Sequence, residues 1–268
     1  VLPPLSAPGP RWLLVFANQL TSLPESLGAL QRLEGVVASD NHLTALPAAL
    51  SQCTQLHTLH LARNLLTSLP KQLPPLRHLD LASNPLAGFP AAISRLHTLE
   101  HLNLSGCGLA EVPESIGELV GLKTLILDHN PLRRLPDALL DLPALETLSL
   151  GETGLTSLPL LPKSLKTLQV SGCSLGQLPE AMTGLQLERL ELPRCGLTDI
   201  SAVPDCEHLS LFGNLLESLP EDLWERTRLV SLSVRGNRLR SLPPGTAARL
   251  ETLEASGNAL RHLALPQM

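Results

Sequence analysis

The chain contains very few aromatic residues, with no tyrosine, three phenylalanines and two tryptophans among 268 residues. Hydrophobic residues nevertheless make up 43% of it. Aromatic rings supply much of the buried area in many protein cores. Because they are so scarce here, the sequence predicts a core built from layers of aliphatic side chains, mainly leucine.

The sequence lacks the signatures of several classes of function. The 20 basic residues are scattered among 25 acidic ones, and the net charge is −5, whereas nucleic-acid binding requires basic residues clustered on one face. No apolar run approaches the roughly 18 residues of a membrane helix. The sequence has no glycine-rich phosphate loop, no Gly-x-Ser-x-Gly and no His-Glu-x-x-His motif. We therefore expect no nucleic-acid partner, no membrane association, no cofactor and no catalysis within this chain.

The chain instead carries one pattern twelve times with small variations, Leu-x-x-Leu-x-Leu-x-x-Asn-x-Leu. Successive copies are 19 to 23 residues apart, a spacing typical of solenoids in which each repeat forms one coil. The period is unbroken, so residues 1–268 are predicted to form a single domain. Because the chain opens with Val1 and finishes in a half-repeat at 263–266, we expect it to be part of a longer protein. The Asn position of the pattern falls at Asn18, Asn41, Asn64, Asn84, Cys107, Asn130, Thr153, Cys173, Cys195, Asn214, Asn237 and Asn258.

The spacing of the leucines within each repeat predicts a short β-strand followed by a turn. In the repeat around Asn64, Leu59 and Leu61 are two residues apart and are expected to point into the core, with Thr58 and His60 on the opposite face. Proline follows the last apolar position in ten repeats, and proline suits a helical turn or an extended segment better than a strand ladder. The predicted fold is an α/β solenoid of about twelve coils, with a curved parallel sheet on the concave face and short helical or extended turns on the convex face.

These repeats resemble the leucine-rich-repeat superfamily over essentially the whole chain. Residues 23–41 and 219–237 look like the Leu-Pro-x-x-Leu units of cytoplasmic repeat proteins, and the shorter unit 158–170 looks like the repeats of bacterial type III secreted effectors. In the ubiquitin-ligase effectors of that group, such repeats bind the host target and restrain a separate catalytic domain, whose Cys-x-Asp motif does not occur here. The mixture of long and short units is also similar to repeat domains of bacterial kinases and Roco-type GTPases.

The resemblance implies that the chain recognises a partner protein through its concave face, as the target-recognition domain of a bacterial effector or signalling protein. The alternative is intramolecular regulation, in which the solenoid inhibits an attached ubiquitin ligase, kinase or GTPase. Only this alternative predicts a gain of activity when the solenoid is deleted. We expect a monomer that acts in the cytoplasm, either of the bacterium or, after secretion, of a host cell.

The Asn position is altered at Cys107, Thr153, Cys173 and Cys195. In leucine-rich-repeat proteins this asparagine bonds to backbone groups of the adjacent coil, and a thiol is too weak a donor and acceptor to replace it. Because the last three altered positions are consecutive, we expect residues 150–205 to differ in curvature and to have weaker amide protection than the flanking coils. The five cysteines all occupy repeat positions, which indicates buried free thiols; a disulfide between the adjacent Cys173 and Cys195 is the alternative.

Two groups of concave side chains are candidates for partner binding. The first group lies on repeats three to six, and its histidines and carboxylates could bind a divalent metal. The alternative is a polar protein-binding surface whose charge depends on pH, because a sheet spreads its side chains apart and does not direct them to one point. We favour the second interpretation. The first group comprises His60, His78, Asp80, His101, Asn103 and Asp128. The second group comprises Arg189, Phe212 and Arg235, residue types that often anchor protein interfaces.

Near its start the concave face is apolar, because Trp12, Leu14, Phe16 and Val37 occupy positions that are polar in most solenoids. An N-terminal cap that covers them is the favoured interpretation, because a solenoid needs polar caps over its terminal layers. If exposed, these side chains would form a binding patch.

Overall fold

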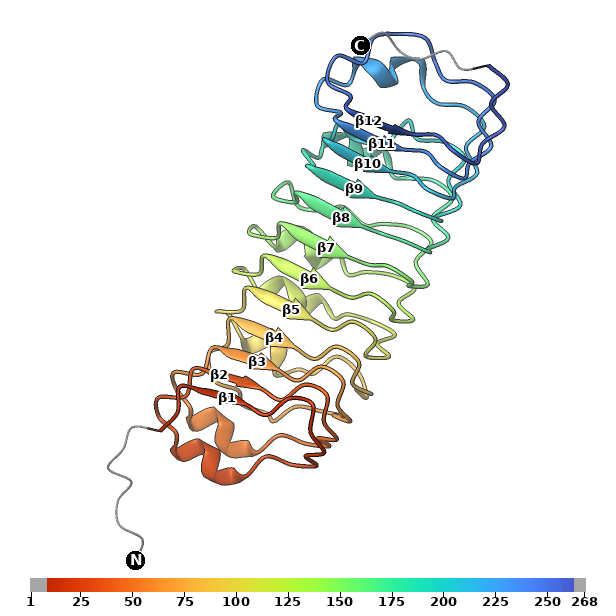
Figure 1. Cartoon of the computed structure of the whole chain (residues 1–268). Helices are drawn as coiled ribbons and strands as arrows, with labels where there is room; N and C mark the ends of the chain where they lie inside the picture. The colour runs from red at the N-terminus through yellow and green to blue at the C-terminus, as the bar shows by residue number, and fades with distance from the viewer. Residues whose placement is uncertain (1–8, 263–268) are drawn as a thin grey trace, which may run out of the picture.

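The structure, a computed structural model, describes residues 9–262 and consists of twelve coils. Each coil contributes one three-residue strand to a single parallel sheet, in which every strand pairs with the next one along the chain. The strands line one side of the solenoid, and its two ends lie far apart (Figure 1). The predicted solenoid is confirmed, while the two chain ends discussed above lie outside the described residues. The strands are β1 (Trp12–Leu14), β2 (Gly35–Val37), β3 (Thr58–His60), β4 (His78–Asp80), β5 (His101–Asn103), β6 (Thr124–Ile126), β7 (Thr147–Ser149), β8 (Thr167–Gln169), β9 (Arg189–Glu191), β10 (His208–Ser210), β11 (Ser231–Ser233) and β12 (Thr252–Glu254).

The middle residue of each strand points into the core, as expected because successive side chains of a strand point to opposite faces. These residues stand opposite one another in the sheet, for example Leu59 beside Leu79 and Leu79 beside Leu102. The middle residue is buried in β2 to β11, but only partly buried in β1 and β12. Leu13 and Leu253 differ from the rest because a terminal strand has a neighbouring coil on one side only.

Within residues 9–262 the convex face is built from seven short 3-10 helices and from extended segments. Repeat length decides which of the two occurs. Repeats of 22 or 23 residues contain a helix, whereas the described repeats of 19 to 21 residues do not. A 3-10 helix advances only about 2 Å per residue, so the additional residues fit into the same coil. No helix within residues 9–262 has the length and apolar character needed to cross a membrane. The helices are η1 (Glu25–Ala29), η2 (Ala48–Gln52), η3 (Ile93–Arg95), η4 (Glu114–Glu118), η5 (Asp137–Asp141), η6 (Glu180–Gly184) and η7 (Glu221–Glu225).

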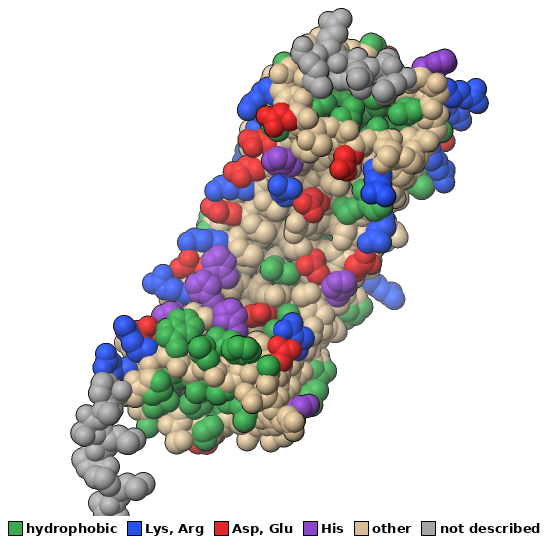
Figure 2. All heavy atoms as spheres, viewed as in Figure 1, with side chains coloured by type: hydrophobic (Ala, Val, Ile, Leu, Met, Phe, Trp, Pro, Cys, Tyr) green, Lys and Arg blue, Asp and Glu red, His purple; other side chains and the backbone are tan. Residues whose placement is uncertain are grey.

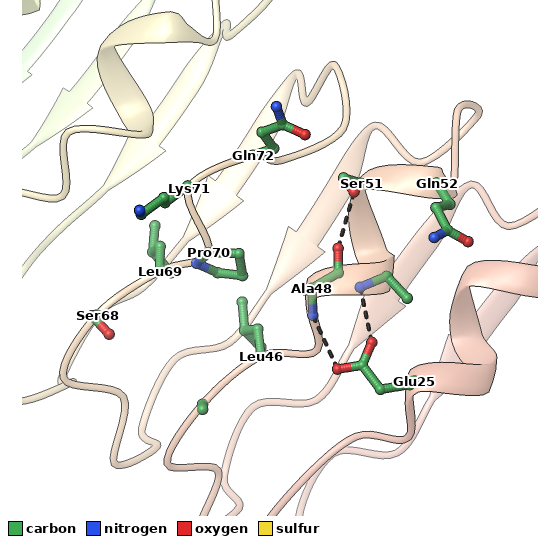
Figure 3. A pocket seen from close by; sticks show the side chains of 12 residues that line it. Glu25, Leu46, Ala48, Ser51, Gln52, Ser68, Leu69, Pro70, Lys71 and Gln72 are labelled. Carbon is green, nitrogen blue, oxygen red and sulfur yellow. Dashed lines mark hydrogen bonds between the residues drawn. The ribbon is translucent and has the colours of Figure 1, made fainter.

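Proline immediately precedes six of these seven helices, in an extended conformation. Glutamates of one coil then cap the helix of the next coil. The Glu25 carboxylate accepts hydrogen bonds from the N–H groups of Ala48 and Ala49 at the start of η2 (3.3 and 3.0 Å; Figure 3). In the same way Glu114 accepts from the N–H of Ala138 in η5 (3.0 Å). These contacts hold neighbouring convex turns in register.

Two repeats that lack a helix leave notches in the convex face. The first notch, of about 750 Å³, separates η2 from the extended segment around Pro70 (Figure 3). Leu69 lines it and is only partly buried, although the repeat pattern places this residue in the core. The second notch, of about 190 Å³, is lined by Leu140, Leu160 and Met182 among others.

Asparagine side chains form a ladder of hydrogen bonds between the coils, as the resemblance implies. Asn64 is representative: its Nδ2 donates to the carbonyl oxygens of Ala38 in the preceding coil and Leu61 in its own coil, both at 2.9 Å. Its Oδ1 accepts from the N–H of Leu43 in the preceding coil at 3.0 Å. The ladder therefore pairs buried backbone groups that would otherwise lack a partner.

The cysteines replace the hydrogen bonds that the asparagine side chain donates, but not those that it accepts. The Sγ atoms of Cys107 and Cys195 donate to carbonyl oxygens of the preceding coil, Leu81 (3.2 Å) and Val170 (2.9 Å). Cys107 offers no amide oxygen, so the hydrogen bond that an asparagine would accept from the N–H of Leu86 is missing. The N–H of Leu86 donates to the carbonyl oxygen of Asn84 in its own coil (2.8 Å).

We expect the amides of residues 150–205 to exchange with solvent faster than those of the flanking coils, because Thr153, Cys173 and Cys195 lack the amide oxygen of the ladder. Hydrogen exchange followed by mass spectrometry measures this. The variant Cys173→Asn restores the acceptor and should slow exchange in the coil that precedes it. Equal protection in all twelve coils, or no slowing in the variant, would contradict the prediction. The expected difference in curvature likewise stays a prediction.

All five cysteines are buried and unpaired, so the predicted free thiols are confirmed and the Cys173–Cys195 disulfide is absent from the structure. Burial raises the pKa of Cys195 and that of Cys206 to about 12. Because the thiolate is the reactive form of cysteine, these side chains are inert components of the core.

Candidate functional site

The first and third residues of each strand project from the concave face and form two columns that run along the solenoid. Parallel register aligns them from coil to coil, so that His78 lies between Thr58 and His101, and Asp80 lies between His60 and Asn103. Histidine side chains gather over the N-terminal half of this face, beside an apolar area at its end (Figure 2). The columns change from coil to coil, whereas the core positions repeat.

Three of the predicted histidines are brought together on β3, β4 and β5. The rings of His78 and His101 are stacked, with centroids 4.7 Å apart and planes 14° from parallel. His60 Nδ1 lies 3.8 Å from an oxygen of Asp80, and His101 Nδ1 lies 3.0 Å from the hydroxyl of Thr124. These side chains border a shallow hollow of about 250 Å³.

His78 is the most constrained member of this group. Its Nδ1 is buried and has no hydrogen-bond partner within the described part of the chain. Burial, and after it the nearby His101, lowers the pKa of His78 below its ordinary value of 6.5. Glu100 opposes this shift, while His57 and His60 add to it. His78 is therefore neutral at neutral pH.

The arrangement does not suit a metal ion. In-plane lone pairs of stacked imidazoles point side by side, whereas metal ligands must converge on one point. Within residues 9–262, no group of three or more histidine, cysteine, aspartate or glutamate side chains is placed to hold a metal. The predicted role of the first group in partner binding stays a prediction.

Asp128 has a role inside the solenoid. Its carboxylate accepts hydrogen bonds from the hydroxyl of Ser149 (2.8 and 2.9 Å) and from the N–H of Gly151, both in the next coil. A Cβ atom at position 151 would lie 2.6 Å from Ser171 Oγ and 3.1 Å from an Asp128 oxygen. The absence of a side chain at Gly151 therefore lets the carboxylate approach the backbone, and Asp128 joins two coils.

The second group is only partly assembled. The guanidinium of Arg235 lies 5.7 Å from the centre of the Phe212 ring, within the range of a cation–π contact. Phe212 is 38% exposed. Arg189 is instead 3.4 Å from Glu191 on its own strand. Phe212 and Arg235 thus form a small exposed platform, and Arg189 belongs to a separate ion pair.

The apolar side chains near the start are exposed in the structure: Trp12 by 45%, Leu14 by 61% and Phe16 by 54%. Trp12 lies over Gly35, where a Cβ atom would come within 2.2 Å of the ring. Its ring also meets that of His57 edge to face, with centroids 6.4 Å apart. The apolar area and the histidines therefore form one continuous surface.

Ion pairs between coils occupy the charged side chains along the edge of the sheet. Glu100 binds both Arg77 (2.9 Å) and Lys123 (2.6 Å), and Glu146 binds Lys166 (3.0 Å). Exposed pairs of this kind add little to stability. They do give each of these five side chains an oppositely charged partner.

Sequence reasoning did not identify His57, Thr124 and Ile126 as part of the site. Thr124 and Ile126 border the same hollow as the histidines. Thr124 is the register partner of His101, and Ile126 that of Asn103, so a complete reading of the two columns could have found them. His57 precedes β3 and gave no such signal.

Comparison with known proteins agrees with the repeat pattern. Sequence profiles of the leucine rich repeat family match residues 54–109 and 164–185. A leucine-rich-repeat protein of Leptospira interrogans is 32% identical with a TM-score of 0.86, over 92% of this chain and 66% of that protein. YopM, a leucine-rich effector protein of Yersinia pestis, is 30% identical with a TM-score of 0.74, over 94% of this chain and 68% of its own.

A plant structure is also similar. The leucine-rich-repeat ectodomain of a membrane receptor kinase from Arabidopsis thaliana, in complex with Casparian strip integrity factor 2, is 29% identical with a TM-score of 0.66, over 94% of this chain and 37% of that one. No curated protein matches this chain significantly. The chain spans about two thirds of each bacterial relative. Repeat pattern, asparagine ladder and sequence identity agree, and the chain belongs to the leucine-rich-repeat family.

Proposed function

We propose that this chain is a protein-recognition module that binds a partner protein through its concave face. The observation that carries the proposal is the group of exposed apolar and aromatic side chains on that face, including Leu14, Phe16 and Phe212, together with partly exposed imidazoles. A leucine core repeats because every coil must pack on the next, but packing does not require these exposed side chains. Exposed apolar groups beside polar ones are typical of interaction surfaces.

Leucine-rich-repeat proteins commonly act as protein–protein interaction modules, and the similar plant ectodomain was solved in complex with Casparian strip integrity factor 2. We extend the proposal to the target-recognition part of a bacterial effector or signalling protein. Two bacterial relatives support this extension, one of them an effector. The proposed site of action is a reducing cytoplasm, of the bacterium or of a host cell, because all five thiols are unpaired.

The double variant His78→Ala/Phe212→Ala is expected to reduce capture of the partner by at least about tenfold, because truncation of an anchoring side chain at an interface commonly costs about 2 kcal/mol or more. Quantitative pull-down from extracts of the source organism and of candidate host cells, with immobilised chain at pH 7.5, measures this loss.

The matched control for that experiment changes the convex side. Val120 follows η4, Leu140 lies in η5, and both are exposed. The variant Val120→Ala/Leu140→Ala should capture as much partner as the unchanged chain. Equal capture by the concave variant, or equal loss in the convex variant, would contradict recognition through the concave face.

A further inference from the structure

Four histidines, which we call the histidine cluster, lie within three neighbouring coils of the concave face: His57, His60, His78 and His101. They adjoin the apolar area at the N-terminal end through the contact between Trp12 and His57. Histidine is the side chain that changes charge between about pH 5 and 8. The charge of this surface therefore depends on pH.

Few carboxylates are available to neutralise the cluster once it is charged. Glu100 is engaged by Arg77 and Lys123. Glu34, which lies beside His57 in the preceding coil, is engaged by Arg11. Asp80 lies 3.8 Å from His60, while its other oxygen accepts from the N–H of Ala82. A protonated cluster would therefore carry more positive charge than the carboxylates beside it can balance.

Charging His78 is unfavourable in the unbound solenoid. A protonated imidazole donates from both nitrogens, but Nδ1 of His78 is buried without a hydrogen-bond partner among residues 9–262, and the ring is stacked on His101. The pKa of His78 is lowered for these reasons, burial first. On acidification, His78 therefore takes up a proton at a higher pH in the unfolded chain than in the folded one. The stability contributed by neutral His78 is present above pH 6.5 and is lost as the pH falls through the lower, folded pKa.

We propose that the histidine cluster binds an acidic segment of the partner protein, and that acidification from about pH 7.5 to 5.5 strengthens this binding. The inference rests on the proposed function and names the chemistry of the partner at that site. Carboxylates of such a segment supply the negative charge that the protonated cluster lacks. Binding and proton uptake then promote each other, because each proton taken up on binding changes the dissociation constant by about tenfold per pH unit.

The neighbouring side chains indicate the rest of the segment. In the column of third strand residues, Val37 precedes His60, and Ile126 follows Asn103. Apolar side chains therefore flank the cluster on both sides. From β2 to β6 the surface spans four strand spacings, about 19 Å, which an extended peptide covers with about six residues. The segment that fits therefore carries acidic residues in its middle and aliphatic residues at its two ends.

The test uses the whole chain and a fluorescein-labelled six-residue peptide with leucine at both ends and glutamate at the four central positions. Fluorescence polarisation at pH 7.5, 6.5 and 5.5 gives the dissociation constant, and glutamate stays ionised over this range. We expect the Kd to fall at least about tenfold between pH 7.5 and 5.5. A peptide with glutamine in place of glutamate should show no such change. Circular dichroism checks at each pH that the chain remains folded.

The variant H60Q/H78Q/H101Q, which leaves only His57 of the cluster, should lose most of the pH dependence, whereas H42Q, which changes an exposed histidine outside the cluster, should keep it. As a second measurement on the unchanged chain, NMR titration of His78 should show its pKa rising when the peptide is bound. A pH-independent Kd, no binding at pH 5.5, or an unchanged pH dependence in the triple variant would overturn the proposal.

The two proposals fail separately. If the concave double variant loses the partner at pH 7.5 but neither the peptide nor the partner binds more tightly in acid, recognition through the concave face stands and the acidic segment is wrong. If the concave variant captures the partner as well as the unchanged chain does, the proposed function itself fails.

Discussion

Replacing Leu125 with alanine is expected to lower the free energy of unfolding by about 2 to 5 kcal/mol, because the change removes buried methyl groups and leaves a cavity. Leu125 is the middle residue of β6 and is completely buried. Coils lie on both sides of it, so the cavity cannot close without shifting two neighbouring layers. Urea unfolding followed by circular dichroism measures the loss.

The same position in the terminal coil provides the control. Leu13 is the middle residue of β1 and is only partly buried. Leu13→Ala should therefore cost clearly less than Leu125→Ala, since less surface is buried there. Equal costs would mean that the first coil packs as completely as the sixth, which would contradict the burial described above.

Replacing Asn130 with alanine is expected to destabilise the chain by about 2 to 6 kcal/mol, because each buried amide left without an acceptor costs about 1 to 3 kcal/mol. Asn130 accepts from two amides of the preceding coil, those of Cys107 (3.1 Å) and Leu109 (2.9 Å). Its Nδ2 also donates to the carbonyl oxygens of Leu104 (2.8 Å) and Leu127 (2.9 Å). Urea unfolding, with a constant dependence on denaturant, again gives the difference.

Two further variants separate the parts of this effect. Asn64 accepts from one amide, that of Leu43, so Asn64→Ala should cost less than Asn130→Ala. Cys107→Ala removes one thiol bond and little volume, and should cost least of the three. If Cys107→Ala lowered the free energy of unfolding as much as Asn130→Ala, the amide oxygen would not be the source of the stabilisation.

The repeat pattern alone specified the fold. Leu59, Leu79 and Leu102 recur at a fixed place in each repeat, and each must be buried against the next coil, so their spacing along the chain already defines the strand, its register and the buried face. Repeat length also carries the information about helices and notches, because coils of 19 to 21 residues lack the residues for a 3-10 turn. The asparagine ladder followed from the resemblance to the family.

The arrangement of the site was decided by the tertiary structure. The sequence placed His60, His78 and His101 on neighbouring strands, but the stacking of two rings and the burial of His78 Nδ1 depend on how side chains of different coils pack. Asp128 has the same position in the sequence pattern as Phe212, yet the space left by Gly151 turns its carboxylate toward the next coil. The core could be read from the sequence because the same contact recurs in every coil. The concave face could not, because each of its contacts occurs once.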